Sequence, residues 1–190
     1  MNARAGAALL LIDVQQGFDE SYWGRRNNPE AERRMAELLE AWRSAGWPVI
    51  HVQHMSTTPG SPLQPGLPGN AIRPEVAPIG DERLFQKWVN SAFIGTGLEA
   101  YLREQGIDAL VIVGLTTDHC ISTTSRMAGN LGFAVTVIDD ATATFDRTGP
   151  DGVHYSAEQM HRTALASLHG EFGEVLPSSK VLAWLEEAAS

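Results

Sequence analysis

Cys120 is the only cysteine in the chain, and its position suits a nucleophile. The apolar segment 109–113 has the pattern of a buried strand, and Gly-Leu-Thr-Thr-Asp-His then leads into a helix that carries the thiol in its first turn. Free N–H groups at a helix N-terminus favour a thiolate and also bind an oxyanion, so we expect a lowered pKa for Cys120. The alternative is a small buried side chain with no chemical role, the common fate of free cysteine.

Asp13 and Lys87 are the other residues whose type and position suggest chemistry. Asp13 follows the apolar segment 8–12, and Lys87 lies late in the strand predicted over 83–89. In open parallel sheets, ligands bind beyond the carboxyl ends of the strands. A cysteine nucleophile there needs a proton acceptor and a nearby cation, which Asp13 and Lys87 supply. Each also has a simpler interpretation, Asp13 as a turn or capping residue and Lys87 as a surface lysine.

The hydrophobic pattern predicts strands that alternate with helices along the chain. The predicted strands are 8–12, 47–53, 83–89, 109–113 and 134–138, and the predicted helices are 29–46, 97–105, 120–132, 156–168 and 181–188. This alternation is typical of a three-layer α/β fold with a mostly parallel sheet of about six strands. We expect residues 1–190 to form one domain.

Three irregular segments are predicted to shape a binding pocket. Residues 55–80 hold six of the ten prolines, and connections of that length often serve as binding loops or lids. The segments 21–28 and 146–155 are expected to contribute to specificity with it.

Composition narrows the class of protein and of partner. The net charge of −9 argues against binding to nucleic acid. No apolar stretch approaches the roughly 20 residues that span a bilayer, so we expect no membrane association. A single cysteine excludes an internal disulfide and fits a reducing compartment, and we therefore expect a cytoplasmic protein that acts on a small molecule.

Five sequence motifs occur in order along the chain, at 10–18, 85–87, 91–98, 114–120 and 139–145. Together they make the chain resemble the isochorismatase-like cysteine hydrolases, from residue 8 to about residue 170. That superfamily includes nicotinamidases, N-carbamoylsarcosine amidases, and biuret and streptothricin hydrolases.

The resemblance implies a role for each matching residue. Asp13 is the general base, Lys87 its cationic partner and Cys120 the nucleophile. It also implies a cis peptide bond between Leu115 and Thr116, with the N–H groups of Thr116 and Cys120 as the oxyanion hole. The reaction is hydrolysis of an amide, ureide or lactam C–N bond through a thioester on Cys120.

Four further residues are candidates for contact with the substrate. They are Phe18, His54, Trp88 and His154. Each has a structural alternative: core packing for the two aromatic residues, hydrogen bonding within the fold for His54 and an exposed loop for His154.

We expect neither a metal nor a cofactor. On a strand, His51 and His54 point to opposite faces, so one ion cannot easily bind both. Nicotinamidases that bind metal carry an Asp-x-His pair in this region, where this chain has His51 and Gln53. The segment 95–100 has the spacing of a dinucleotide-binding motif, but it does not follow a first strand as such a motif should.

Two other functions and one assembly state stay open. A true isochorismatase cleaves an enol ether instead of an amide, and a non-catalytic member would use the same pocket only to bind a small molecule. The resemblance implies a homo-oligomer, a dimer or a tetramer, because members of the family commonly self-associate. The five tryptophans agree with this expectation, since some of them could cover an interface.

Overall fold

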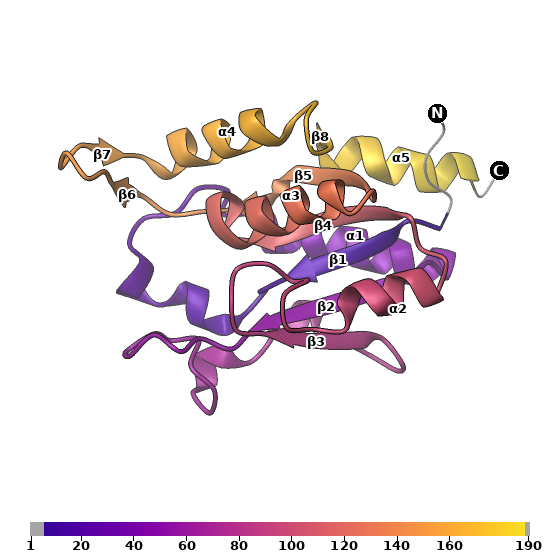
Figure 1. Ribbon diagram of the computed structural model, residues 1–190, viewed down its shortest axis with the longest axis horizontal. Helices are drawn as coiled ribbons and strands as arrows, with labels where there is room; N and C mark the ends of the chain where they lie inside the picture. The colour runs from indigo at the N-terminus through magenta and orange to yellow at the C-terminus, as the bar shows by residue number, and fades with distance from the viewer. Residues whose placement is uncertain (1–5, 189–190) are drawn as a thin grey trace.

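The computed structural model describes residues 6–188, which form a parallel sheet covered by helices on both faces (Figure 1). The strands are β1 (Ala8–Ile12), β2 (Val49–His54), β3 (Arg83–Lys87), β4 (Ala109–Leu115), β5 (Ala134–Ala143), β6 (Arg147–Thr148), β7 (His154–Tyr155) and β8 (Glu174–Leu176). The α-helices are α1 (Ala31–Ala45), α2 (Leu98–Glu104), α3 (Ser122–Asn130), α4 (Ala157–Leu168) and α5 (Ser178–Ala188). Short helical turns are η1 (Gln16–Asp19), η2 (Ser21–Trp23), η3 (Pro68–Asn70), η4 (Pro74–Val76) and the π-helical turn η5 (Thr117–Ile121).

The main sheet has six strands in the order β3-β2-β1-β4-β5-β8. All five neighbouring pairs are parallel, which confirms the predicted α/β class. β1 lies between β2 and β4, so the last residues of these strands meet at one edge. In the register, Ile12 pairs with both Val52 and Gly114, and His54 pairs with Lys87.

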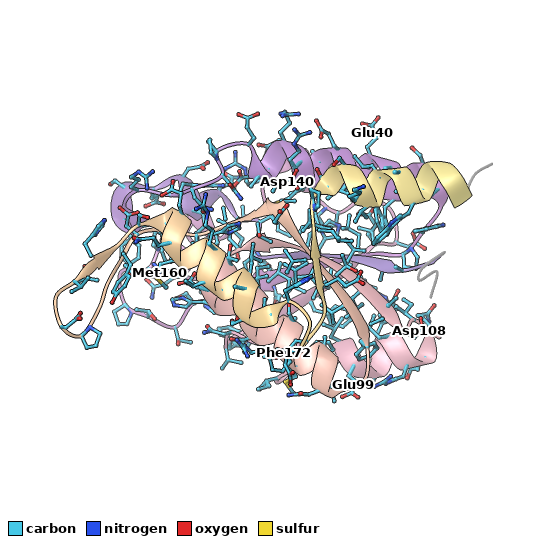
Figure 2. The ribbon with its side chains drawn as sticks, turned by 90° about the horizontal axis from the view of Figure 1, so that it is seen from above. Glu40, Glu99, Asp108, Asp140, Met160 and Phe172 are labelled. Carbon is cyan, nitrogen blue, oxygen red and sulfur yellow. The ribbon has the colours of Figure 1, made fainter. Side chains whose placement is uncertain are left out.

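The helices form two layers with the sheet between them. Figure 2 shows Glu40 on α1 and Glu99 on α2 at opposite outer faces. Successive residues of β1 point to opposite faces, since Leu9 and Leu11 pack with α1 and α5 while Leu10 and Ile12 pack with α2 and α4. A strand buried on both faces needs a continuous apolar sequence, which 8–12 provides.

The predicted helix boundaries have clear local causes. α1 buries a stripe at helical spacing and ends at Gly46, whose φ of 67° is the left-handed conformation that glycine adopts without strain. α4 begins with the predicted capping box, in which Ser156 and Gln159 exchange hydrogen bonds between side chain and backbone. None of the helices in residues 6–188 is long and apolar enough to cross a membrane.

The structure differs from the prediction in β5, in β8 and in the start of α3. β5 continues to Ala143 beyond the expected end at residue 138, because it resumes pairing with β4 after a register shift between Ile112 and Gly114. β8 was not predicted, since three partly exposed residues carry too weak a pattern. α3 begins at Ser122, after Cys120, because the residues before it form η5.

An ion-pair network connects α1 to the sheet through Arg43 on α1, His51 on β2 and Glu82, the residue before β3. Arg43 donates two hydrogen bonds to the carboxylate of Glu82, at 2.7 and 2.9 Å, and His51 Nε2 lies 2.8 Å from the same group. Burial lowers the pKa of His51, so its neutral ring donates to Glu82. Burial opposes the charge on Glu82, but hydrogen bonds from Arg43, His51 and the Ile79 N–H outweigh it and lower the pKa of Glu82 to about 2.

Glu82→Gln is expected to lower the free energy of unfolding at pH 7 by roughly 1–3 kcal/mol, since it removes a charged acceptor from three donors. The folded pKa is about 2 and the unfolded value 4.5. This stabilisation is therefore complete above about pH 5 and is lost as pH falls toward 2. Urea denaturation at pH 7 and pH 3 measures the difference, with Glu104→Gln on the exposed side of α2 as the control. A difference as large at pH 3 as at pH 7 would contradict this assignment.

Candidate active site

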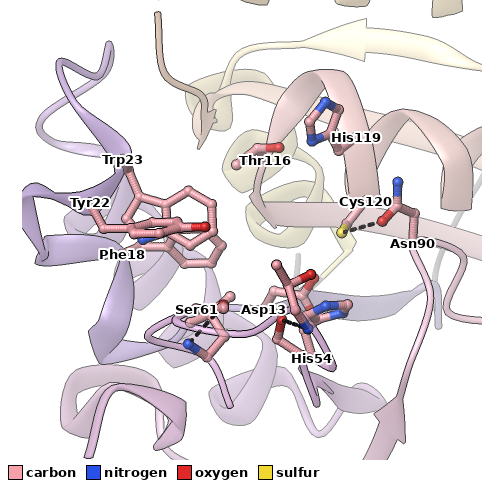
Figure 3. A pocket seen from close by; sticks show the side chains of 13 residues that line it. Asp13, Phe18, Tyr22, Trp23, His54, Ser61, Asn90, Thr116, His119 and Cys120 are labelled. Carbon is pink, nitrogen blue, oxygen red and sulfur yellow. Dashed lines mark hydrogen bonds between the residues drawn. The ribbon is translucent and has the colours of Figure 1, made fainter. Parts of the chain in front are cut away.

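A cavity of about 220 Å³ opens at the carboxyl ends of β1, β2 and β4. It contains both acidic and nucleophilic groups on one side and aromatic rings on the other (Figure 3). Its lining residues are Asp13, Phe18, Tyr22, Trp23, His54, Ser56, Thr58, Ser61, Leu63, Asn90, Thr116, His119 and Cys120.

The ammonium group of Lys87 lies behind the cavity wall and forms hydrogen bonds with three of the lining residues. It is fully buried and donates to Asp13 Oδ2 at 2.7 Å, to His54 Nδ1 at 3.1 Å and to Cys120 Sγ at 3.3 Å. A fourth contact, at 3.3 Å, reaches the carbonyl oxygen of Val89. Asp13 and Cys120 therefore both contact the buried ammonium of Lys87, so the three residues that the sequence singled out at strand ends lie together.

Each of these groups is positioned by the end of a strand. Asp13 follows β1 with a φ of 54°, unusual for a residue other than glycine, while its N–H donates to the carbonyl of Val52 on β2. Lys87 is the last residue of β3, and its carbonyl accepts from the N–H of Met55, which follows β2. These backbone contacts fix the two side chains relative to each other.

The turn that carries Cys120 depends on Gly114. This glycine has a φ of 122°, and a Cβ atom on it would lie 2.0 Å from the carbonyl oxygen of Ile12. Only glycine fits so close an approach of β4 to β1. The peptide bond between Leu115 and Thr116 is cis, and η5 begins directly after it.

Burial gives the Cys120 thiol a pKa opposite to the one expected. Burial is the largest effect and raises the pKa, and the negative charge of Asp13 raises it further, whereas Lys87 lowers it less. The expectation of a lowered pKa was wrong because it considered the helix N-terminus alone. The free enzyme therefore holds a protonated thiol beside a carboxylate and an ammonium.

The pKa values of Lys87 and His54 keep one positive charge in the cluster. Burial alone would lower the pKa of Lys87, but the negative charge of Asp13 is the largest opposing effect, and the pKa of Lys87 lies above its ordinary value. Burial and the positive charge of Lys87 lower the pKa of His54. A neutral His54 that accepts from Lys87 through Nδ1 carries its proton on Nε2.

Residues that the sequence did not single out support the Cys120 turn. Thr117 Oγ1 lies 2.9 Å from His161 Nδ1 on α4. Asp118 accepts hydrogen bonds from the hydroxyl of Thr144 and from Arg147. These contacts come from segments distant in the chain, so no local pattern could have revealed them.

Aromatic side chains form the wall opposite Cys120. Phe18 stacks on Phe145 with ring centroids 5.9 Å apart, and Trp23 lies 4.9 Å from Phe18. The indole N–H of Trp23 donates to the carbonyl of Gly17 at 2.8 Å, so its ring is held in place. Phe18 was expected to line the pocket and does; Trp23 lies within the segment 21–28, expected to influence specificity, but was not named.

The segment 55–80 forms a second wall, held by buried amide side chains. Asn70 donates to the carbonyl oxygens of Leu63 and His54, at 2.7 and 2.9 Å. Gln15 in turn donates to the carbonyl of Asn70 at 2.7 Å. The long segment is thus attached to the strand ends at the edge of the cavity.

Two predicted pocket residues lie elsewhere. Trp88 follows Lys87 but is 52% exposed and does not line the cavity. His154 is in β7, where it is exposed and lies 3.3 Å from a carboxylate oxygen of Asp146. The β6–β7 hairpin projects from the end of the molecule opposite the two termini (Figure 1), and His154 is not among the residues that line the cavity. His54 does line the cavity as expected.

Asp13, His54 and Cys120 are also a possible metal-binding group. One potential ligand atom of each lies within 4.8 Å of the others. The Lys87 ammonium already contacts all three side chains and occupies this position with a positive charge of its own. A metal ion would have to displace a buried lysine, which costs the energy of separating it from Asp13.

Comparison with known proteins identifies relatives along nearly the whole chain. The uncharacterized isochorismatase family protein YrdC of Bacillus subtilis is 46% identical over 92% of this chain and 94% of its own length. A streptothricin hydrolase of Streptomyces noursei is 33% identical over 90% of this chain and 62% of its own length. Nicotinamidase 3 of Arabidopsis thaliana is 27% identical over 92% of this chain and 86% of its own length.

The fold has equally similar solved structures. A crystal structure of an isochorismatase family protein from Chromobacterium violaceum superposes with a TM-score of 0.92 at 49% identity, covering 95% of this chain and 94% of that one. The model of the isochorismatase domain family matches residues 7–179. Because the family model matches most of the chain and YrdC is 46% identical to it, the chain belongs to the isochorismatase family of hydrolases.

Proposed function

We propose that this protein hydrolyses a C–N bond of a small amide, ureide or lactam through a thioester on Cys120. The observation that carries the proposal is the buried Lys87 ammonium, which binds both Asp13 and the Cys120 sulfur. Similarity to a nicotinamidase supports an amide-type substrate. The cavity of about 220 Å³ suits a small molecule.

In the first half of the proposed reaction, Asp13 accepts the thiol proton of Cys120 as the sulfur attacks the carbonyl carbon. Asp13 Oδ2 is hydrogen-bonded to Lys87, whereas Oδ1 has no partner among the described residues and is free to take the proton. The raised pKa of Cys120 means that deprotonation accompanies attack instead of preceding it. The Lys87 ammonium stabilises the charge as it moves from carboxylate to sulfur.

In the second half, the intermediate releases its nitrogen and then reacts with water. Protonated Asp13 returns the proton to the leaving nitrogen as the C–N bond breaks, which leaves a thioester on Cys120. Asp13 then removes a proton from water, and the hydroxide adds to the thioester carbonyl. The C–S bond breaks to release the acid, and the departing sulfur takes the proton back from Asp13, which restores the thiol and the carboxylate. We assign the oxyanion hole to the N–H groups of Thr116 and Cys120.

Asp13→Asn is expected to lower kcat/KM for the best substrate by roughly 100- to 10,000-fold, because the amide has the shape of the carboxylate but accepts no proton. Cys120→Ala is expected to remove turnover altogether. A panel of primary amides, ureides and lactams, assayed by ammonia or amine release, measures both. Asp151→Asn, in an exposed loop, is the matched control.

Full turnover by Cys120→Ala, or by the wild type with Cys120 completely alkylated, would contradict the thioester mechanism. Cleavage of isochorismate by Cys120→Ala without amide turnover by the wild type would indicate the enol ether reaction. A tight ligand with no turnover of any kind would indicate a binding protein.

Alkylation of Cys120 by iodoacetamide is expected to rise steadily with pH up to about pH 10, whereas a free thiol levels off above its pKa of about 8.5. The cause is burial, which raises the pKa of Cys120 and delays thiolate formation. Because the charge of Asp13 also raises this pKa, Asp13→Asn should react faster than the wild type at pH 8, opposite to its effect on turnover. Mass spectrometry measures both rates, with glutathione as the reference thiol. A wild-type rate that levels off below pH 8 would refute this account of the thiol.

We also propose that the protein is a cytoplasmic homo-oligomer, a dimer or a tetramer. An apolar patch on the edge strand β3 and the residues after it supports self-association, since exposed edges with large apolar side chains are common interfaces. Its members are Leu84, Trp88, Val89 and Ile94, each more than 40% exposed. The single cysteine, which needs no oxidising compartment, supports the location.

Light scattering is expected to give a mass of two or four protomers of 20.6 kDa. Trp88→Glu should shift the mass toward one protomer, because it places a charge within the apolar patch. Val153→Glu, on the β6–β7 hairpin, is the control and should leave the mass unchanged. A wild-type mass of one protomer would disprove self-association.

A further inference from the structure

The cavity offers a bound molecule no unpaired positive charge from a lysine or an arginine. Among the described residues that line it, Asp13 is the one carboxylate, and neither basic residue type occurs. Lys87 lies behind the wall and is already neutralised by Asp13, with 2.7 Å between Nζ and Oδ2. This ion pair therefore leaves no net charge to attract an anion.

Arginines in the segments that form the walls are also engaged. Segments 21–28 and 55–80 contain Arg25, Arg26 and Arg73, and each forms an ion pair within the protein. The pairs are Arg25 with Glu158, Arg26 with Glu32 and Arg73 with Glu75, at N–O distances of 2.7, 2.8 and 3.0 Å. A substrate carboxylate would have to compete with these acidic residues for each arginine.

The two histidines of the lining do not replace the missing cation. Burial and the charge of Lys87 lower the pKa of His54, whose Nδ1 accepts from Lys87. The neutral ring offers only the uncharged N–H of Nε2. His119 Nε2 lies 3.6 Å from Asp118 Oδ2, so any positive charge on this ring is balanced by that carboxylate.

An anion that enters this cavity pays an uncompensated cost. A carboxylate that leaves water loses its hydration, and a paired cation is what normally offsets that loss in a protein. A carboxamide has the same shape but loses far less, because it carries no net charge. Asp13 adds repulsion, since it lies on the lining while Lys87 lies behind it.

We propose that the cavity selects uncharged substrates and rejects amides that carry a carboxylate close to the scissile bond. This inference rests on the proposed function and narrows its substrate class. The substrate is then a neutral amide, ureide or lactam, whose other groups meet aromatic rings and uncharged hydrogen-bonding side chains. Isochorismate, which carries two carboxylates, lies outside this class.

The first test needs no turnover and uses two reagents of nearly the same shape, iodoacetamide and anionic iodoacetate. Each forms a C–S bond with a thiol and releases iodide and the thiol proton. At pH 8, the ratio of the iodoacetamide rate to the iodoacetate rate should be at least about tenfold larger for Cys120 than for 2-mercaptoethanol, an uncharged thiol. Mass spectrometry of the intact protein measures both rates, because Cys120 is the only cysteine.

Two neighbouring substitutions separate the cavity from the net charge of the protein. Thr58→Lys adds an ammonium to the lining and should reduce the ratio for Cys120 roughly three- to tenfold. Thr57→Lys adds the same charge at an exposed residue that does not line the cavity, so its ratio should stay near the wild-type value. Thermal unfolding of both variants controls for stability.

The second test compares succinamide with succinamate, in which a carboxylate replaces one of the two carboxamides. The wild type should hydrolyse succinamide with a kcat/KM at least about tenfold higher, counted per scissile amide. Thr58→Lys should narrow this preference, whereas Thr57→Lys should not. Ammonia release measures both reactions.

The two tests separate the possible failures. If no amide is hydrolysed but the two reagents discriminate as expected, the proposed hydrolysis fails and the charge selection stands. If the ratio of reagent rates for Cys120 equals that for 2-mercaptoethanol, or if the two lysine substitutions change it equally, the charge selection is overturned, whatever the amide assays show.

Discussion

A single buried ammonium group determines how this site is built. Lys87 is fully buried, and its charge is compatible with that environment only because Asp13, His54 and Cys120 surround it. Removing one partner of a buried ion pair typically costs about 3–5 kcal/mol, since the other charge is left uncompensated. The ends of β1, β2 and β3 and the turn after β4 must therefore come together closely around this ammonium.

The parallel sheet satisfies this constraint through its strand order. β1 is central, so a residue after it lies close to the ends of both neighbouring strands. Gly114 then allows β4 to approach Ile12 closely enough for the following turn to reach Asp13. The polar cluster is thus a product of backbone geometry, and the surrounding loops add the aromatic and amide walls.

Much of this arrangement could be predicted from local patterns. Asp13 interrupts an apolar run and Cys120 follows another, and both signals arise because parallel strands are apolar until they end. β8 and the extension of β5 were missed because their residues are held by pairing with distant strands and carry little pattern of their own. Trp88 was misplaced because β3 ends at Lys87: the lysine is buried in the cluster, whereas Trp88, the next residue, is 52% exposed. The thiol pKa was mispredicted because burial depends on tertiary packing.

A sulfur that remains protonated in the free protein has a further consequence for the life of the molecule. Oxidation by peroxide proceeds through the thiolate, as does exchange with disulfides. Cys120 is buried with a raised pKa, and no second cysteine is available to form a disulfide within the chain. In the proposed mechanism, the nucleophile is therefore a thiol that forms little thiolate before substrate binds, and burial itself slows its oxidation without any dedicated protective residue.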